Sequence, residues 1–176
     1  NQATQAAAMF DALDKAATAG DADKTGSVFN DMKDRYAGAT LTEQAGLIAA
    51  RVQYDKGQID AAKSSLGWVG EHAAEVEYRA IARLRLAGVL MDAKDYAGAL
   101  TALDGISAKD FAGLAADRRG DVLLAQGKTD EARTAYKAAY AAMDDKTDYR
   151  RLVEVKLTAL STPPVPAAAA ASGAAK

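Results

Sequence analysis

The feature that most constrains the fold of this chain is a pattern that recurs at intervals of 37 and 33 residues. Each unit contains a small residue, the anchor, with another small residue twelve positions before it and mostly larger residues four and seven positions after it. The anchors are Ala62, Ala99 and Ala132; twelve positions earlier lie Ala50, Ala87 and Gly120; four positions later lie Leu66, Leu103 and Tyr136; and seven positions later lie Val69, Ile106 and Ala139. Self-similarity at such a period is typical of repeat proteins.

The spacing predicts that each unit is a hairpin of two antiparallel helices. Small residues that face each other let two helices approach closely, and the positions four and seven residues beyond the anchor share one face of the second helix. We therefore expect Ala99 to be buried against Ala87, and Ala132 against Gly120. One hairpin leaves half of its apolar surface uncovered, so the hairpins must stack.

The turn inside each hairpin falls five positions before the anchor, at Gly57, Lys94 and Gly127. Glycine reaches the left-handed conformation found at many helix ends without steric cost. After the last of these turns, we expect Thr129 or Asp130 to cap the second helix.

A weaker, fourth unit precedes the other three. Gly20 lies at its turn, Thr25 at its anchor, and Phe29 and Met32 at the two following positions. The interval from Thr25 to Ala62 is again 37 residues. Four hairpins are therefore expected.

Together with the helix that follows the last hairpin, the pattern predicts an all-α chain. All three prolines lie within the last fourteen residues, so no proline interrupts the repeats. The expected helices are 3–19, 21–36, 41–56, 59–73, 76–93, 96–107, 110–126, 129–143 and 148–160. The last helix can cover the exposed end of the stack with Leu152, Val155 and Leu160. Residues 1–160 are interpreted as one domain, and residues 161–176 as a low-complexity tail rich in Pro and Ala.

The composition argues against several classes of function. The formal net charge is −2 with acidic and basic residues interspersed, whereas nucleic-acid binders usually carry a basic face. The longest apolar run is far shorter than the ~20 residues that span a bilayer. Absence of cysteine excludes disulfides and thiolate metal sites, and is compatible with cytoplasm or periplasm. Because the chain begins at Asn1 without an initiator methionine, we expect an upstream segment in the gene product.

No residue pattern predicts catalysis or cofactor binding. His72 is the only histidine and has no second histidine or cysteine to share a metal with, so we expect it at a helix end. Trp68 is interpreted as packing between repeats, although an exposed Trp would be a binding anchor. The acidic pairs Asp21/Asp23, Asp117/Asp121 and Asp144/Asp145 are interpreted as solvated surface, with contact to a partner as the alternative. The pairs Arg118/Arg119 and Arg150/Arg151 are too short for a nucleic-acid patch.

The helical hairpins resemble tetratricopeptide repeats. More narrowly, three segments resemble the periplasmic domain of the YfgM family of ancillary SecYEG translocon subunits. They are "LIAARVQYDKGQIDAAKSSLGWVGEH" (47–72), "ARLRLAGVLMDAKDYAGALTALDGI" (82–106) and "ADRRGDVLLAQGKTDEARTAYKAAY" (116–140), which include Trp68 and the sequence Arg119-Gly120-Asp121. The resemblance implies a tetratricopeptide-repeat-like right-handed α-solenoid of about four hairpins with a C-terminal capping helix.

The same resemblance implies a non-enzymatic scaffold on the periplasmic face of the bacterial inner membrane. Its partners would be the Sec translocon and a periplasmic peptidyl-prolyl isomerase chaperone, and a membrane helix would precede the repeats. Another bacterial repeat adaptor, in envelope assembly or in a cytoplasmic complex, is the alternative function, and an enzyme is the alternative outside this class.

In this repeat type, the first helix of each hairpin lines an inner groove. Four positions of that helix face the groove in each of the second to fourth hairpins. The candidate partner-binding residues are Leu47, Arg51, Tyr54, Ile81, Leu84, Met91, Leu114, Asp117 and Asp121, and Gln44, Gly88 and Leu124 complete the set. An apolar groove suits an amphipathic helix or an extended apolar segment of a partner. Alternatively, helix 148–160 or the tail fills the groove.

Overall fold

The computed structural model describes residues 1–161, all in helices and the short connections between them. The chain divides into two compact units, Asn1–Ala108 and a second that begins at Lys109. The prediction of a single domain over residues 1–160 stays a prediction. The expected tail, apart from Ser161, lies outside the described residues.

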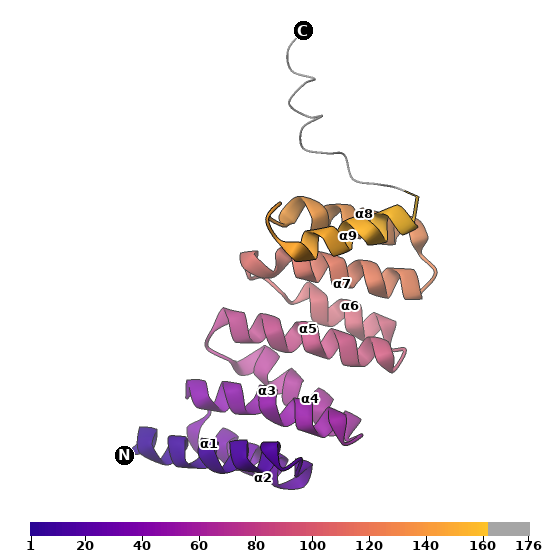
Figure 1. The fold of residues 1–176 in the computed structure, drawn as a ribbon. Helices are drawn as coiled ribbons and strands as arrows, with labels where there is room; N and C mark the ends of the chain where they lie inside the picture. Colours follow the sequence, from indigo (N-terminus) through magenta and orange to yellow (C-terminus); the bar gives the residue numbers. More distant parts are fainter. Residues whose placement is uncertain (162–176) are drawn as a thin grey trace. The chain divides into compact units, whose positions relative to one another are not determined.

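The first unit contains six helices in three consecutive hairpins (Figure 1). They are α1 (Gln2–Thr18), α2 (Ala22–Tyr36), α3 (Thr40–Asp55), α4 (Ile59–His72), α5 (Val76–Asp92) and α6 (Tyr96–Asp104). Each helix packs against the next, and α3 also packs against α1 and α5. The first helices of the three hairpins are therefore neighbours along one side of the unit.

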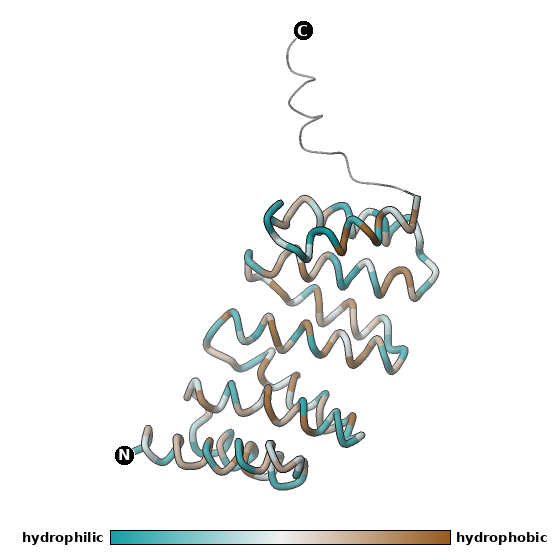
Figure 2. The backbone as a smooth tube through the Cα atoms, viewed as in Figure 1, coloured by the Kyte–Doolittle hydropathy of each residue, from teal (hydrophilic) through white to brown (hydrophobic). Residues whose placement is uncertain are grey.

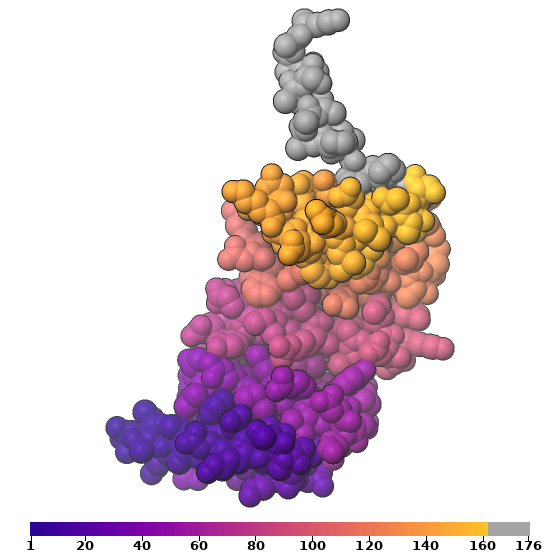
Figure 3. Space-filling model, viewed as in Figure 1, coloured from indigo at the N-terminus to yellow at the C-terminus, as the bar shows by residue number. Residues whose placement is uncertain are grey.

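The second unit begins with a short 3-10 helix, η1 (Lys109–Phe111), and continues with three α-helices. They are α7 (Ala112–Ala125), α8 (Thr129–Ala142) and α9 (Asp148–Ala159). α7 and α8 form the fourth hairpin, and α9 packs against α8. α9 forms part of the face of this unit that Figure 3 shows. The expected capping helix is therefore present.

The repeat register is confirmed by burial. All four anchors, Thr25, Ala62, Ala99 and Ala132, have 0% exposure. The residues four positions later, Phe29, Leu66, Leu103 and Tyr136, are all buried as well. Ala87 and Gly120 are buried as predicted, and the Tyr136 ring supplies the nearest atoms to Gly120. Figure 2 shows the resulting alternation of apolar and polar residues along the helices.

The four turns adopt the expected conformation. Gly20, Gly57 and Gly127 have φ angles of 71°, 78° and 77°, and Lys94, which takes the same position in the third hairpin, has φ 63°. Left-handed backbone at this position is therefore a property of the hairpin rather than of glycine.

Two local predictions were wrong. α6 ends at Asp104 rather than at residue 107, so Ile106 lies beyond the helix and is only half-buried. Neither Thr129 nor Asp130 caps α8, because the helix already begins at Thr129 and Lys128 occupies the cap position. In the first and third hairpins, by contrast, Asp21 and Asp95 accept hydrogen bonds from the backbone N–H groups of Lys24 and Gly98.

Candidate partner-binding site

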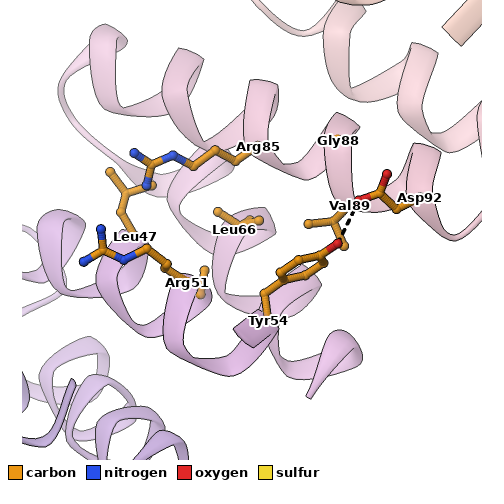
Figure 4. A pocket seen from close by; sticks show the side chains of 9 residues that line it. Leu47, Arg51, Tyr54, Leu66, Arg85, Gly88, Val89 and Asp92 are labelled. Atoms are coloured by element: carbon orange, nitrogen blue, oxygen red, sulfur yellow. Dashed lines mark hydrogen bonds between the residues drawn. The ribbon is translucent and has the colours of Figure 1, made fainter. Parts of the chain in front are cut away.

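An apolar pocket opens between α3, α4 and α5 in the first unit (Figure 4). Its volume is about 270 Å³. The lining residues are Leu47, Ala50, Arg51 and Tyr54 of α3, Leu66 of α4, and Arg85, Gly88, Val89 and Asp92 of α5. An apolar cavity of about 150 Å³ can hold a benzene ring, so this pocket is large enough for a bulky apolar side chain of a partner.

The floor of the pocket is part of the core of the first unit. Leu47, Ala50 and Leu66 are buried in the same apolar cluster as Phe29 and Val69. These side chains are held from below by the packing of the hairpins, so the floor is formed without a partner. Gly88 of α5 lines the pocket without a side chain. A Cβ atom built at Gly88 would have no other atom within 4 Å, so the space beside this residue is open.

The two ends of the pocket differ in charge. Figure 4 shows the guanidinium groups of Arg51 and Arg85 at one end and the contact between Tyr54 and Asp92 at the other. The Tyr54 hydroxyl donates a hydrogen bond to Asp92 Oδ2 at 2.7 Å. This hydrogen bond and the negative charge of Asp92 raise the pKa of Tyr54, so Tyr54 keeps its proton and donates at neutral pH.

The second and third hairpins place only some of the predicted residues in this pocket. Leu47, Arg51 and Tyr54 line it, and Tyr54 is 38% exposed. Ile81 is partly buried against the core cluster instead. Leu84 and Met91 are half-buried outside the pocket lining.

Helix α5 contributes residues that the repeat pattern did not indicate. Arg85, Val89 and Asp92 each follow a position that we had assigned to the groove. The predicted groove positions use the same offsets from the anchor in every hairpin. This pocket, however, lies between α3 and α5, which are the first helices of neighbouring hairpins, so the residues of α5 that line it are those on the side nearer α3. Charge alone did not identify Arg85 and Asp92, because three other residues of the same helix are charged and do not line the pocket.

In the second unit, the predicted acidic residues contact α9. Lys156 Nζ lies 2.9 Å from Asp117 Oδ1 and 3.0 Å from Asp121 Oδ1. The Tyr149 hydroxyl donates to Asp117 Oδ2 at 2.8 Å, and the Tyr136 hydroxyl donates to Asp121 Oδ1 at 2.6 Å. Asp117 has 0% exposure, so the interpretation of this pair as solvated surface is wrong. The sequence pattern placed both carboxylates on one helix face but did not show that a lysine of α9 would lie over them.

This cluster raises the pKa values of Tyr136, Tyr149 and Lys156. Burial and the hydrogen bond to Asp121 raise the pKa of Tyr136, and burial and the hydrogen bond to Asp117 raise that of Tyr149. Burial lowers the pKa of Lys156, but its hydrogen bonds to Asp117 and Asp121 outweigh this and raise it overall. Lys156 is therefore a cation that bridges α9 to α7. Leu114 makes none of these polar contacts and lines a hollow with Met143, which Tyr149 also lines.

The remaining candidate residues, Trp68 and His72, make packing contacts within the first unit. Trp68 packs edge-on against Phe29, with ring centroids 5.7 Å apart, as expected for packing between repeats. His72 is exposed at the end of α4, as expected, and stacks on Trp68. Among residues 1–161 no group of three or more His, Asp or Glu side chains is placed to hold a metal ion. No helix in the described part of the chain is long and apolar enough to cross a membrane.

Comparison with known proteins agrees with the helical hairpins. Residues 1–162 match the family described as "Tetratricopeptide repeat-like domain". The chain is 32% identical to the ancillary SecYEG translocon subunit of Neisseria gonorrhoeae over 155 residues, which cover 88% of this chain and 74% of that protein. It is 30% identical to the ancillary SecYEG translocon subunit of Escherichia coli over 117 residues, which cover 66% of this chain and 56% of that protein. The chain therefore belongs to the tetratricopeptide repeat-like family that includes the ancillary SecYEG translocon subunits.

Proposed function

We propose that this chain is a non-enzymatic interaction domain that binds partner proteins at the Sec translocon. Two relatives that each share about a third of their aligned residues with it carry the name ancillary SecYEG translocon subunit. Stacked helical hairpins serve proteins mainly as binding surfaces. The observation that carries the proposal in this chain is the apolar pocket between α3, α4 and α5, which has a buried floor and exposed polar ends.

The place of action that we propose is the periplasmic face of the bacterial inner membrane, with an anchoring helix outside the present sequence. A periplasmic peptidyl-prolyl isomerase chaperone is the second proposed partner. Both proposals rest on the resemblance of segments 47–72, 82–106 and 116–140 to the YfgM family.

The proposed mode of binding is insertion of an apolar side chain into the pocket. Leu47 would contact this side chain from below, while Arg51 and Tyr54 would contact the partner at the rim. Leu84 and Met91 lie four residues before and three residues after Gly88, so they share its stripe on α5 and would extend the contact. Asp117 and Asp121 already bind Lys156, and we assign them to holding α9 in place.

The test uses Gly88→Leu, which fills the pocket without removing a contact. A side chain at residue 88 enters open space, and leucine is a better helix former than glycine by up to ~1 kcal/mol, so the variant should melt at or above the wild-type temperature. We expect its affinity for purified SecYEG of the source organism to fall by about tenfold or more, as at an interface hot spot. Binding is measured by surface plasmon resonance in detergent micelles.

The matched control is Gly67→Leu. Gly67 also lies within a helix, with no atom within 4 Å of a Cβ built there, but it does not line this pocket. Gly67→Leu should bind SecYEG as the wild type does. If Gly88→Leu binds equally well, the pocket is not the binding site; if the wild-type chain itself shows no binding, association with the translocon is wrong.

A further inference from the structure

The pocket holds two cations without a carboxylate partner. Arg51 and Arg85 are both exposed, and among residues 1–161 neither guanidinium group has a hydrogen-bonding or ion-pairing carboxylate. Other arginines of the same unit are engaged: Arg79 Nη1 donates to the carbonyl of Ala73, and Arg83 Nε donates to that of Gly70. Arg35, the remaining arginine of this unit, lies over the Tyr36 ring. Among the arginines of the first unit, Arg51 and Arg85 at the pocket are therefore the two whose guanidinium groups have no partner within residues 1–161.

The geometry brings these two cations to the same end of the pocket from different helices. Arg51 comes from α3 and Arg85 from α5, and Figure 4 shows both guanidinium groups near Leu47, at the end opposite Asp92. Two like charges at one site repel each other unless an anion lies near both. The planar fork of a guanidinium group matches a carboxylate, and it can donate two hydrogen bonds to it.

The opposite end of the pocket disfavours an anion. Asp92 is exposed there, and its Oδ2 atom already accepts the hydrogen bond of Tyr54. A carboxylate of a ligand at that end would lie beside a like charge and would find the Tyr54 proton already donated. The pocket therefore favours an acidic group of a ligand at the end with Arg51 and Arg85 and disfavours one at the end with Asp92.

We propose that the pocket binds an amphipathic helical segment that carries a glutamate or aspartate one turn from a bulky apolar side chain. The apolar side chain enters over Leu47, Leu66 and Val89, and the carboxylate binds Arg51 and Arg85. Residues one turn apart lie about 5–6 Å from each other on one face of a helix, which suits an apolar floor beside a cationic rim. This inference rests on the proposed function and adds the chemistry of the partner.

The experiment measures the binding of synthetic helices to the whole chain by fluorescence anisotropy and by NMR chemical shifts. Each peptide has about 15 residues, an acetylated N-terminus and an amidated C-terminus, so that no terminal charge contributes. The acidic peptide carries leucine and glutamate one turn apart. The matched peptides carry glutamine or lysine in place of the glutamate, and a further acidic peptide keeps its free C-terminal carboxylate.

We expect the acidic peptide to bind about three- to tenfold more tightly than the glutamine peptide, as for two solvent-exposed ion pairs. The lysine peptide should bind more weakly still, and the free terminal carboxylate should add nothing. The Arg51→Gln/Arg85→Gln variant should remove the difference between the acidic and glutamine peptides. A control that loses two positive charges from α2, Lys24→Gln/Arg35→Gln, should keep it, because neither residue lines the pocket.

Equal binding of the acidic and glutamine peptides would overturn the inference, and so would the absence of saturable binding at millimolar concentration. A preference for the free terminal carboxylate would overturn it as well, in favour of a chain-end site. None of these outcomes depends on SecYEG. If Gly88→Leu loses SecYEG binding but the wild-type chain binds the acidic and glutamine peptides equally well, the proposed function stands. Only the proposed preference of the pocket for an acidic side chain would then be wrong.

Discussion

At the scale of single residues, the turn of each hairpin requires one residue in the left-handed conformation, and three of the four hairpins have glycine at that position. Lys94 has φ 63°, whereas the other three hairpins place glycine there. A left-handed conformation costs an ordinary L-residue about 1–2 kcal/mol, and glycine avoids this steric cost. Glycine also has greater conformational freedom in the unfolded chain, which offsets part of the stability gained by replacing Lys94 with glycine.

We therefore expect Lys94→Gly to raise the free energy of unfolding by about 0.5–1 kcal/mol. Lys94→Ala should change it little, because alanine keeps the steric cost. Conversely, Gly127→Ala should lower it by about 1 kcal/mol. Urea denaturation followed by circular dichroism measures all three, and a destabilised Lys94→Gly variant would contradict this account of the turn.

A second prediction at this scale concerns the close contact between α7 and α8. A Cβ atom at Gly120 would clash with Cε1 of the buried Tyr136 ring, and the Tyr136 hydroxyl is fixed by its hydrogen bond to Asp121. Because the ring cannot move away freely, Gly120→Ala should cost about 1–3 kcal/mol through overpacking.

The control for that prediction is Gly67→Ala, which adds the same methyl group in open space on α4. It should be neutral or stabilising by up to ~1 kcal/mol. Thermal melting of the two variants separates the steric effect from helix propensity. Equal melting temperatures would show that the packing of Tyr136 tolerates the methyl group.

At the scale of the elements, α9 is held to the second unit by apolar packing and one polar cluster. Val153 and Leu157 are fully buried, and Lys156 pairs with the buried carboxylate of Asp117. Lys156→Ala would leave that carboxylate without its cation. We expect a loss of about 3 kcal/mol in the free energy of unfolding, as for removal of one partner of a buried pair, measured by urea denaturation.

Arg151→Ala is the matched control for Lys156→Ala, because Arg151 is exposed on the same helix. Its effect should stay within about 0.5 kcal/mol. Hydrogen exchange should show faster exchange of the α9 amides in Lys156→Ala. If both variants unfold alike, the ion pair does not hold α9.

The same cluster predicts a pH dependence. Folding raises the pKa values of Lys156, Tyr136 and Tyr149, so the folded state holds these protons more tightly than the unfolded state. Their contribution to stability is complete below the unfolded pKa values near 10, and it is lost as the pH rises through and above them. The melting temperature should fall from about pH 10 upward, and less steeply in Tyr136→Phe/Tyr149→Phe. A flat profile between pH 9 and 11 would contradict the assignment.

The elements also show what sequence reasoning can reach. The positions of Ala62, Ala99 and Ala132 predicted the helices and their buried faces, because burial against a neighbouring helix follows directly from helical spacing. The prediction of the residue that caps α8 was wrong because the cap depends on where the preceding turn ends. Residue preferences define the end of a turn only to within one or two positions.

The candidate site was predictable only in part, for a related reason. Leu47 and Tyr54 follow from the register of one hairpin, whereas Arg85 enters the pocket through the packing of α3 against α5. In the same way, the burial of Asp117 depends on a lysine 39 residues later in the chain. Contacts between hairpins have no fixed period, so a repeat pattern does not reveal them.

At the scale of the whole molecule, the two units divide the predicted residues between two roles. The first unit, Asn1–Ala108, contains the open pocket with its two unpaired arginines. The second unit has its conspicuous acidic residues, Asp117 and Asp121, engaged by Lys156. On this account partner binding belongs to the first unit, and α9 stabilises the second.

The most direct test of this claim is photo-crosslinking from inside the pocket. Benzoylphenylalanine replaces Tyr54, which it resembles in shape, and in a control it replaces Ser64, which is exposed on α4 and does not line the pocket. After irradiation with SecYEG-containing membranes of the source organism, crosslinked SecY, SecE or SecG is identified by immunoblot and mass spectrometry. The account predicts a translocon crosslink from residue 54 and none from residue 64; a crosslink from residue 64 alone would contradict it.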